Sequence, residues 1–103
     1  MYSRIAIIGG AGSGKTTLAN KLSEIYNIPA THLDGIHHLE NWKQRDKEER
    51  DKIILKIASQ EKWIIDGTYR ATLRQRLERS DLVVWLDFST IALLKGVIGR
   101  YLK

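Results

Sequence analysis

The feature of this chain that most constrains its fold is a glycine-rich stretch near the N-terminus with the pattern G-x-x-x-x-G-K-[ST]. The pattern is made by Gly9, Gly10, Ala11, Gly12, Ser13, Gly14, Lys15 and Thr16. An apolar run at residues 5–8 precedes it, and leucines at helical spacing follow. A strand that turns through glycines into a helix presents backbone N–H groups and the positive helix end to an anion. This context predicts a β–α unit with a phosphate site at its turn, against the alternative of a glycine-rich turn that binds nothing.

The whole chain, residues 1–103, has the length of one small globular domain. Its hydrophobic fraction of 43% and charged fraction of 28% are ordinary for such a domain. The absence of cysteine excludes disulfides, thiolate metal sites and a cysteine nucleophile. No apolar run is long enough to cross a bilayer, and the N-terminus leads into the first apolar run without a signal peptide. We therefore expect a cytoplasmic protein with no membrane segment.

The formal net charge of +5 suggests an anionic partner, but the basic residues are scattered. Arginines stand at positions 70, 74, 76, 79 and 100, without interleaved aromatic residues and without a nucleic-acid-binding motif. An arginine-lined phosphate pocket explains the excess more economically, and plain solubility explains much of it. Direct nucleic-acid binding is disfavoured by this pattern without being excluded.

The spacing of apolar residues predicts alternating strands and helices. We expect strands at residues 4–8, 30–33, 63–66 and 82–87, and helices at 14–26, 46–60, 71–79 and from about residue 90. Residues 35–44 are expected to be irregular or a short helix, and the charged run at 46–52 a solvated helix face. This alternation predicts an α/β fold with a doubly wound parallel sheet and helices on both faces.

Three carboxylates follow apolar strands in this prediction. Asp34, Asp66 and Asp87 each come at a strand end, as does the glycine-rich stretch. Ligands of parallel sheets bind beyond the carboxyl ends of the strands, so these groups are expected on one rim. Backbone nitrogens for phosphates and carboxylates for a metal are what a Mg-nucleotide site needs. By this pattern alone, either Asp66 or Asp87 could serve the metal.

The residues after the third predicted strand resemble those of a known family. Asp66-Gly67-Thr68-Tyr69-Arg70 resembles the Asp-Gly-Phe-Pro-Arg signature of adenylate kinases, and residues 86–88 and 97–100 resemble their fourth strand and the helix that leads to the lid. The resemblance is closer to the bacterial topology modulation proteins, a P-loop group. It is carried by residues 32–34, 63–69, 76–77, 81 and 85–88 in addition to the phosphate loop. The resemblance implies a three-layer P-loop NTPase fold with parallel strand order 2-3-1-4.

The resemblance also implies how ATP and Mg²⁺ would be held. The residues from Gly9 to Thr17 would surround the phosphates of ATP. Lys15 would stabilise charge on the transferred phosphoryl group. Thr16 would bind Mg²⁺, and Asp66, rather than Asp87, would orient the metal through water.

The acceptor side follows from the same resemblance. Arg70 would grip an anionic group of the acceptor, since a planar guanidinium suits that role. Asp34 would accept the proton of an acceptor hydroxyl, and Arg100 would approach the ATP phosphates. Each has a plainer alternative: Asp34 could cap a turn and Arg70 could be a surface residue.

Histidine and tryptophan residues near the second predicted strand invite further roles. His32, His37 and His38 suggest a metal site, but no second ligand set has metal-binding spacing, so His37 and His38 are expected to be pocket-wall or surface residues. Trp42 could line an acceptor pocket, although a tryptophan among polar residues more often covers a hydrophobic seam.

The chain departs from these families at its C-terminal end. They continue with a lid, a fifth strand and a closing helix, whereas this sequence stops at Lys103, as a natural short chain or as a fragment. Gly96 stands where adenylate kinases carry an arginine against adenine. Without a fifth strand, the strand at residues 82–87 would be an open sheet edge, and such an edge favours pairing with a second copy. We therefore expect a homodimer or an exchange of elements, and weak catalysis.

These observations favour an ATP- and Mg-binding P-loop kinase-like protein that transfers a phosphoryl group to a small hydroxyl or phosphate acceptor. The alternative is a nucleotide-binding regulatory or DNA-topology-associated protein without kinase activity. ATP hydrolysis without transfer is a third option.

Overall fold

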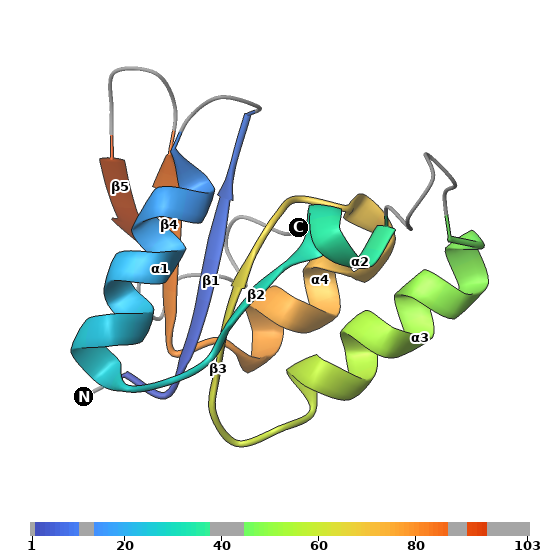
Figure 1. Cartoon of the computed structure of the whole chain (residues 1–103), viewed down its shortest axis with the longest axis horizontal. Coiled ribbons are helices and arrows are strands. Elements are labelled where there is room, and N and C mark those ends of the chain that lie inside the picture. The colour runs from blue at the N-terminus through green and yellow to red at the C-terminus, as the bar shows by residue number, and fades with distance from the viewer. Residues whose placement is uncertain (1, 11–13, 38–44, 87–90, 95–103) are drawn as a thin grey trace.

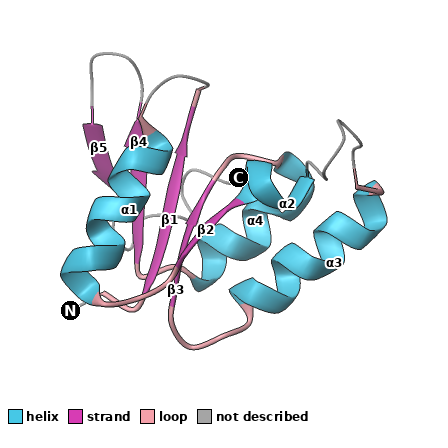
Figure 2. Ribbon diagram, viewed as in Figure 1, coloured by secondary structure: helices cyan, strands magenta, loops and turns pink. Residues whose placement is uncertain are grey.

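The computed structural model describes residues 2–10, 14–37, 45–86 and 91–94, the last of these by their backbone. The strands are β1 (Arg4–Gly9), β2 (Ala30–His32), β3 (Trp63–Asp66), β4 (Leu82–Leu86) and β5 (Ile91–Leu94). The helices are α1 (Lys15–Tyr26), α2 (Leu33–His37), α3 (Lys47–Ala58) and α4 (Arg70–Arg79). One sheet runs through the molecule with helices on its two sides (Figures 1 and 2).

The sheet has the order β2-β3-β1-β4-β5. β1 pairs in parallel with both β3 and β4, and β2 pairs in parallel with β3. The predicted parallel order 2-3-1-4 and the α/β class are therefore confirmed. Because the four strands run in parallel, their carboxyl ends meet on one rim, where ligands of such sheets bind.

The helix predicted from about residue 90 is wrong for residues 91–94. These residues form β5, which runs antiparallel to β4 with Leu86 opposite Ile91. A short apolar run fits a helix or a buried strand equally well, so periodicity alone could not decide. The edge of β4 offers unpaired N–H and C=O groups, and an adjacent strand satisfies them. The outer edge of β4 is consequently paired within the chain, and the expectation of an open edge there is wrong too.

Two hydrophobic layers hold the helices on the sheet. Ile5 and Ile7 of β1 pack toward α1, while Ala6 between them packs toward α3 and α4. This alternation follows from the two-residue period of a strand. It explains why β1 is apolar throughout, because both of its faces are covered. In α1 the leucines at helical spacing, Leu18 and Leu22, pack against this layer, whereas Ile25 is 73% exposed.

Helix boundaries lie close to the predicted ones, and local groups explain where they fall. Asp46 caps α3, and its carboxylate accepts a hydrogen bond from the backbone N–H of Glu49 at 3.4 Å. α1 ends at Asn27, which adopts the left-handed conformation at φ 56°. In the described ranges, no helix is long and apolar enough to span a membrane.

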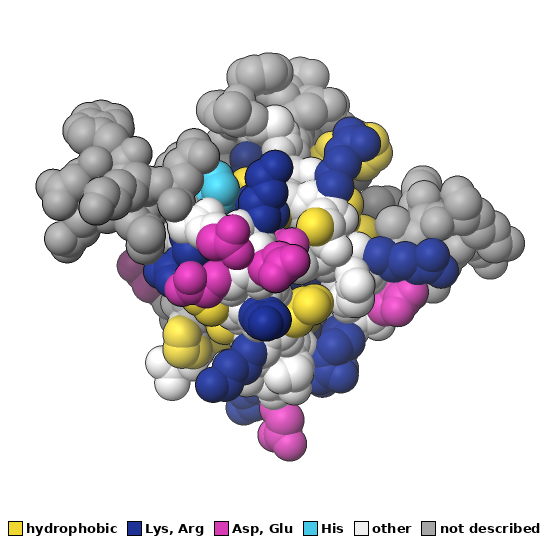
Figure 3. Space-filling view, turned by 90° about the vertical axis from the view of Figure 1, so that its right-hand side faces the viewer, with side chains coloured by type: hydrophobic (Ala, Val, Ile, Leu, Met, Phe, Trp, Pro, Cys, Tyr) yellow, Lys and Arg dark blue, Asp and Glu magenta, His cyan; other side chains and the backbone are white. Residues whose placement is uncertain are grey.

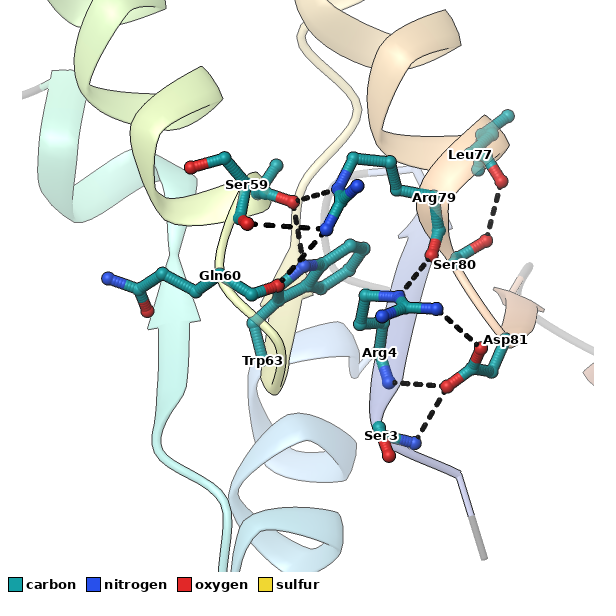
Figure 4. A network of polar contacts seen from close by, with 10 residues as sticks. Ser3, Arg4, Ser59, Gln60, Trp63, Leu77, Arg79, Ser80 and Asp81 are labelled. Carbon is teal, nitrogen blue, oxygen red and sulfur yellow. Dashed lines mark hydrogen bonds and ion pairs between the residues drawn. The ribbon is translucent and has the colours of Figure 1, made fainter.

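A polar network closes the end of the sheet opposite the phosphate loop (Figure 4). The Asp81 carboxylate accepts hydrogen bonds from the backbone N–H groups of Ser3 and Arg4 at 2.9 and 3.1 Å, and from the Arg4 guanidinium at 3.1 Å. Arg79 donates to the backbone carbonyls of Ala58 and Ser59 at 2.6 and 3.2 Å. These bonds tie the starts of β1 and β4 to each other and the C-terminal end of α4 to that of α3.

Replacing Asp81 by asparagine is expected to destabilise the protein by about 1 kcal/mol at neutral pH, because charge-assisted hydrogen bonds are lost. Burial alone raises the pKa of the Asp81 carboxyl, but the N–H groups of Ser3 and Arg4 and the Arg4 guanidinium lower it below its ordinary value overall. A depressed pKa contributes stability above the unfolded-state pKa, near 3.9, and that contribution is lost as the pH falls through the folded-state value.

The check for Asp81 is urea unfolding of both proteins between pH 7 and pH 2.5. The difference between wild type and Asp81→Asn should be largest near neutral pH and shrink below about pH 4. Glu61→Gln is the control, because this exposed residue undergoes the same change of charge. A difference that stays constant over this range would contradict the role given to the Asp81 charge.

Candidate functional site

The phosphate loop is described at its two ends. Gly9 closes β1, and Gly14 precedes the first residue of α1 with a left-handed φ of 91° that favours glycine. Thr16 and Thr17 lie exposed in the first turn of α1, where helix N–H groups have no helical partner. The predicted strand–loop–helix unit is thus present, while Ala11, Gly12 and Ser13 lie outside the described residues.

Lys15 folds back over the loop. Its ammonium group donates hydrogen bonds to the backbone carbonyls of Gly9 and Gly10 at 3.2 and 2.9 Å. An ammonium group has three donors, so one donor remains for another acceptor. The side chain therefore already holds a positive charge above the chain segment that would face a phosphate.

The loop after β3 is joined directly to the phosphate loop. The hydroxyl of Thr68 donates to the carbonyl of Gly9 at 3.2 Å, and the backbone N–H of Gly67 donates to the carbonyl of Ile7 at 2.9 Å. Asp66 stands opposite Ile7 in the β1–β3 register. The structure therefore brings the two sequence motifs together on one rim, as the alternation predicts.

Asp66 is buried and accepts a hydrogen bond from His32, a contact that the sequence did not predict. It is only 4% exposed, and its Oδ2 accepts a hydrogen bond from Nδ1 of His32, its register partner in β2. Within the described residues, the other carboxylate oxygen has no hydrogen-bond partner. The signal available in the sequence was positional, because His32 lies near the end of the second predicted strand and Asp66 at the end of the third, and these two strands are neighbours in the predicted order.

Asp34 lies at the exposed start of α2 and is held by Tyr69. The Tyr69 hydroxyl donates to Asp34 Oδ1 at 2.6 Å. Burial, and then this hydrogen bond to Asp34, raise the pKa of Tyr69 to about 12, so the phenol stays protonated at neutral pH. This pair links the loop after β3 to the end of β2.

Helix α3 reaches the same pair through Arg50. The Arg50 guanidinium lies 5.0 Å from the centre of the Tyr69 ring, and its Nη1 is 3.3 Å from Nδ1 of His37. It also pairs with Asp51 at 3.0 Å, and its side chain is only 11% exposed. The prediction of a wholly solvated charged run is therefore wrong for Arg50 and Asp51, whereas Lys47, Glu48, Glu49 and Lys52 are exposed.

Arg76 is a fully buried arginine that shapes the loop after β3. It donates to the carbonyls of Gly67 at 2.9 Å, Tyr69 at 3.0 Å and Thr68, and to the Thr72 hydroxyl at 3.1 Å. Burial lowers its pKa to about 10, against the opposing effect of the Asp51 carboxylate. In the sequence it was one of several scattered arginines, and only the fold distinguishes it from them.

The part of the chain that the structure describes shows no contact within the site for the remaining predicted residues. Arg70 begins α4 with an exposed side chain and makes no hydrogen bond or ion pair to other described residues. Arg100, Asp87, Gly96, His38 and Trp42 lie outside the described residues.

The donor set fits a magnesium ion that arrives with a nucleotide. In the part of the chain that the structure describes, no three His, Asp or Glu residues cluster to hold a metal. Mg²⁺ usually keeps several waters and takes one or two protein ligands in addition to substrate phosphates. The Thr16 hydroxyl as a direct ligand and the second oxygen of Asp66 acting through a water would suffice for such an ion, and would not suffice for a permanent all-protein site.

Comparison with known proteins agrees with this architecture. The chain is 28% identical to an adenylate kinase from Encephalitozoon cuniculi (strain GB-M1), over an alignment that covers 96% of this chain and 67% of the relative. The crystal structure of a gluconokinase from Sinorhizobium meliloti 1021 superposes on 81% of the chain with a TM-score of 0.54 and 21% identity. The chain spans 55% of that gluconokinase. No protein-family model matches the chain. The chain has a P-loop kinase-like fold.

Proposed function

We propose that this protein binds ATP with Mg²⁺ and transfers a phosphoryl group to a small acceptor. The observation that carries the proposal is the junction between the phosphate loop and the loop after β3, made by Thr68 on the Gly9 carbonyl at 3.2 Å. Phosphoryl transfer depends mainly on positioning and on stabilising charge, so the two loops must be held in fixed relation. The adenylate kinase relative supports a nucleotide as donor.

The donor side would be built on the first β–α unit. Backbone N–H groups of residues 9–17 would hold the phosphates, and Lys15 would turn its ammonium group from the carbonyls of Gly9 and Gly10 toward the transferred group. Thr16 would bind Mg²⁺ directly and Asp66 would orient it through water. When bound, this ion neutralises charge on the phosphates.

The acceptor side would lie around α2 and the start of α4. Asp34 would accept the proton of an attacking hydroxyl, and its present partner, the Tyr69 hydroxyl, occupies one of its oxygens in the way an acceptor hydroxyl would. Arg70, exposed and without a partner among the described residues, would hold an anionic group of the acceptor. Arg100 would approach the ATP phosphates.

Membership of the topology modulation group and a cytoplasmic location are parts of the same proposal. The expected homodimer is not, because β5 covers the edge of β4 through which it was to form. A regulatory or DNA-associated role without transfer is its competitor. Around α3, basic side chains are intermixed with acidic ones such as Glu48 and Glu49, so this face offers no single-signed surface to DNA (Figure 3).

Replacing Lys15 by alanine is expected to weaken ATP binding about 10- to 100-fold, since a charge-assisted hydrogen bond contributes about 1.5–3 kcal/mol. Isothermal calorimetry with ATP and with a non-hydrolysable analogue measures the change. Lys21→Ala is the control, because Lys21 is an exposed lysine of the same helix. An unchanged affinity in Lys15→Ala would overturn the nucleotide site.

Transfer itself is tested by a screen with labelled ATP. Nucleoside monophosphates and gluconate are the first acceptors, in view of the named relatives, followed by other small hydroxyl compounds. Transfer to one acceptor that is lost in Asp34→Asn would support the proposal. ATP binding without any transfer would favour the regulatory role.

A further inference from the structure

We propose that His32 is a positioning residue that orients the Asp66 carboxylate toward the magnesium ion of Mg·ATP. The inference rests on the proposed function, because it concerns the same site. His32 is not a metal ligand in this scheme, and its Nδ1 donates a hydrogen bond to Asp66 Oδ2. Its role is to fix which carboxylate oxygen is available.

The pairing of β2 with β3 places His32 beside Asp66. His32 is the last residue of β2 and Asp66 the last of β3, and they are partners in the parallel register. On its other side Asp66 faces Ile7, two residues before Gly9 of the phosphate loop. The imidazole therefore approaches the carboxylate from the strand farther from the phosphate loop, while β1 lies on the near side.

The burial of Asp66 explains why its contact with His32 matters. The Asp66 side chain is 6% exposed, whereas His32 is 33% exposed. A carboxylate that is removed from water needs a hydrogen-bond donor, and the His32 Nδ1–H supplies it. One oxygen is thereby engaged, and among the described residues the other has no partner. That second oxygen is the one left for a metal-bound water.

A carboxylate that is already fixed in one orientation loses less rotational freedom when it binds a metal-bound water than a freely rotating carboxylate does. Residues that orient direct metal ligands typically contribute about 10- to 100-fold to metal affinity. Because a water would lie between Asp66 and Mg²⁺, we expect the lower end of that range. We expect this contribution to appear only when Mg²⁺ is present, because ATP alone is held by the phosphate loop.

The test compares ATP affinity with excess Mg²⁺ and with EDTA, measured by calorimetry on the whole chain. In His32→Ala, affinity should fall about 10-fold with Mg²⁺ and stay unchanged with EDTA. His32→Asn should restore most of the loss, because the asparagine Nδ2 can donate where the imidazole Nδ1 does. Thr31→Ala, one residue earlier in β2 with its side chain on the other face, should bind like wild type.

A double-mutant cycle with Asp66→Asn separates the pair from its surroundings. If His32 acts through Asp66, the double variant should lose no more Mg-dependent affinity than Asp66→Asn alone. Should His32→Ala fail to fold, His32→Leu takes its place, because leucine fills much of the ring volume without a donor.

The remaining outcomes overturn the inference in distinguishable ways. Equal affinities of His32→Ala and wild type under both conditions would show that the contact does not serve the metal. A parallel loss with Mg²⁺ and with EDTA would show a structural effect on the phosphate loop. Wild-type protein that binds no ATP under either condition would remove the proposed function itself, and the inference with it.

Discussion

Replacing Arg76 by alanine is expected to lower the free energy of unfolding by about 3–5 kcal/mol, because it removes several hydrogen bonds from a charged donor, each of which contributes about 1.5–3 kcal/mol. The guanidinium is fully buried and donates to three consecutive carbonyls, those of Gly67, Thr68 and Tyr69, and to the Thr72 hydroxyl. Its loss removes the guanidinium donor from the carbonyls of buried Gly67 and of Thr68, whereas the Tyr69 carbonyl keeps the backbone N–H of Thr72 at 3.2 Å. Urea unfolding at pH 7 measures the effect.

Arg74→Ala is the matched control for Arg76, because it lies on the same helix. Arg74 is 72% exposed and pairs with Glu78 at 3.0 Å, so its removal should change stability by less than about 1 kcal/mol. Arg76→Lys should also be strongly destabilising, since an ammonium group cannot reproduce the planar fork that meets several carbonyls. Equal stability of Arg76→Ala and Arg74→Ala would contradict the network.

The Arg76 prediction extends to the site, since its acceptors belong to the loop that follows Asp66. If that loop loses its shape, Thr68 no longer meets the Gly9 carbonyl and Tyr69 no longer meets Asp34. Under native conditions, a destabilised but folded Arg76 variant should therefore bind ATP more weakly than Arg74→Ala does.

Gly67→Ala is expected to destabilise the protein by about 2–6 kcal/mol, from backbone strain of about 1–3 kcal/mol and overpacking of a similar size. Gly67 has a φ of 131°, which side-chain-bearing residues rarely adopt. A Cβ there would lie 2.7 Å from the Cβ of buried Leu33 and 3.0 Å from its Cγ and Cδ1. Because Leu33 is fixed between His32 and Asp34, the clash is transmitted to both sides of the candidate site.

Thermal and urea unfolding of Gly67→Ala test this expectation beside Gly35→Ala. Gly35 lies in α2, one residue beyond Asp34, and a Cβ there meets no heavy atom within 4 Å. That variant should differ from wild type by less than about 1 kcal/mol. Similar stability of the two glycine variants would contradict the close approach of the loop after β3 to Leu33.

Elements that depend on local sequence were predicted, whereas elements that depend on distant contacts were not. The strand at Trp63–Asp66 and the helices α1, α3 and α4 were predicted to within two residues at most of their ends, because apolar periodicity and capping residues act over a few positions. The strand β5 was missed, because its assignment depends on the neighbouring edge of β4 and not on its own four residues. A segment that short carries too little periodicity to favour one structure over the other.

The same distinction between local and distant features applies to the candidate site. Lys15, Asp66 and Arg70 were predicted as site residues from contiguous motifs and Asp34 from its place after a strand, and their roles stay predictions. Arg50, Tyr69 and Arg76 were not identified as partners, because each acts on residues of another element. Their burial could not be read from the local pattern, since Arg50 stands in a charged run and Arg76 among exposed arginines.

The sequence by itself determined that β1 turns through glycines into α1 and that carboxylates follow β2 and β3, because these properties belong to short stretches of chain. Only the tertiary structure decided which carboxylate meets which partner. The contacts of His32 with Asp66 and of Asp34 with Tyr69 join residues 34 and 35 positions apart. Such contacts depend on the register of neighbouring strands and on the packing of loops between them, which no local pattern encodes.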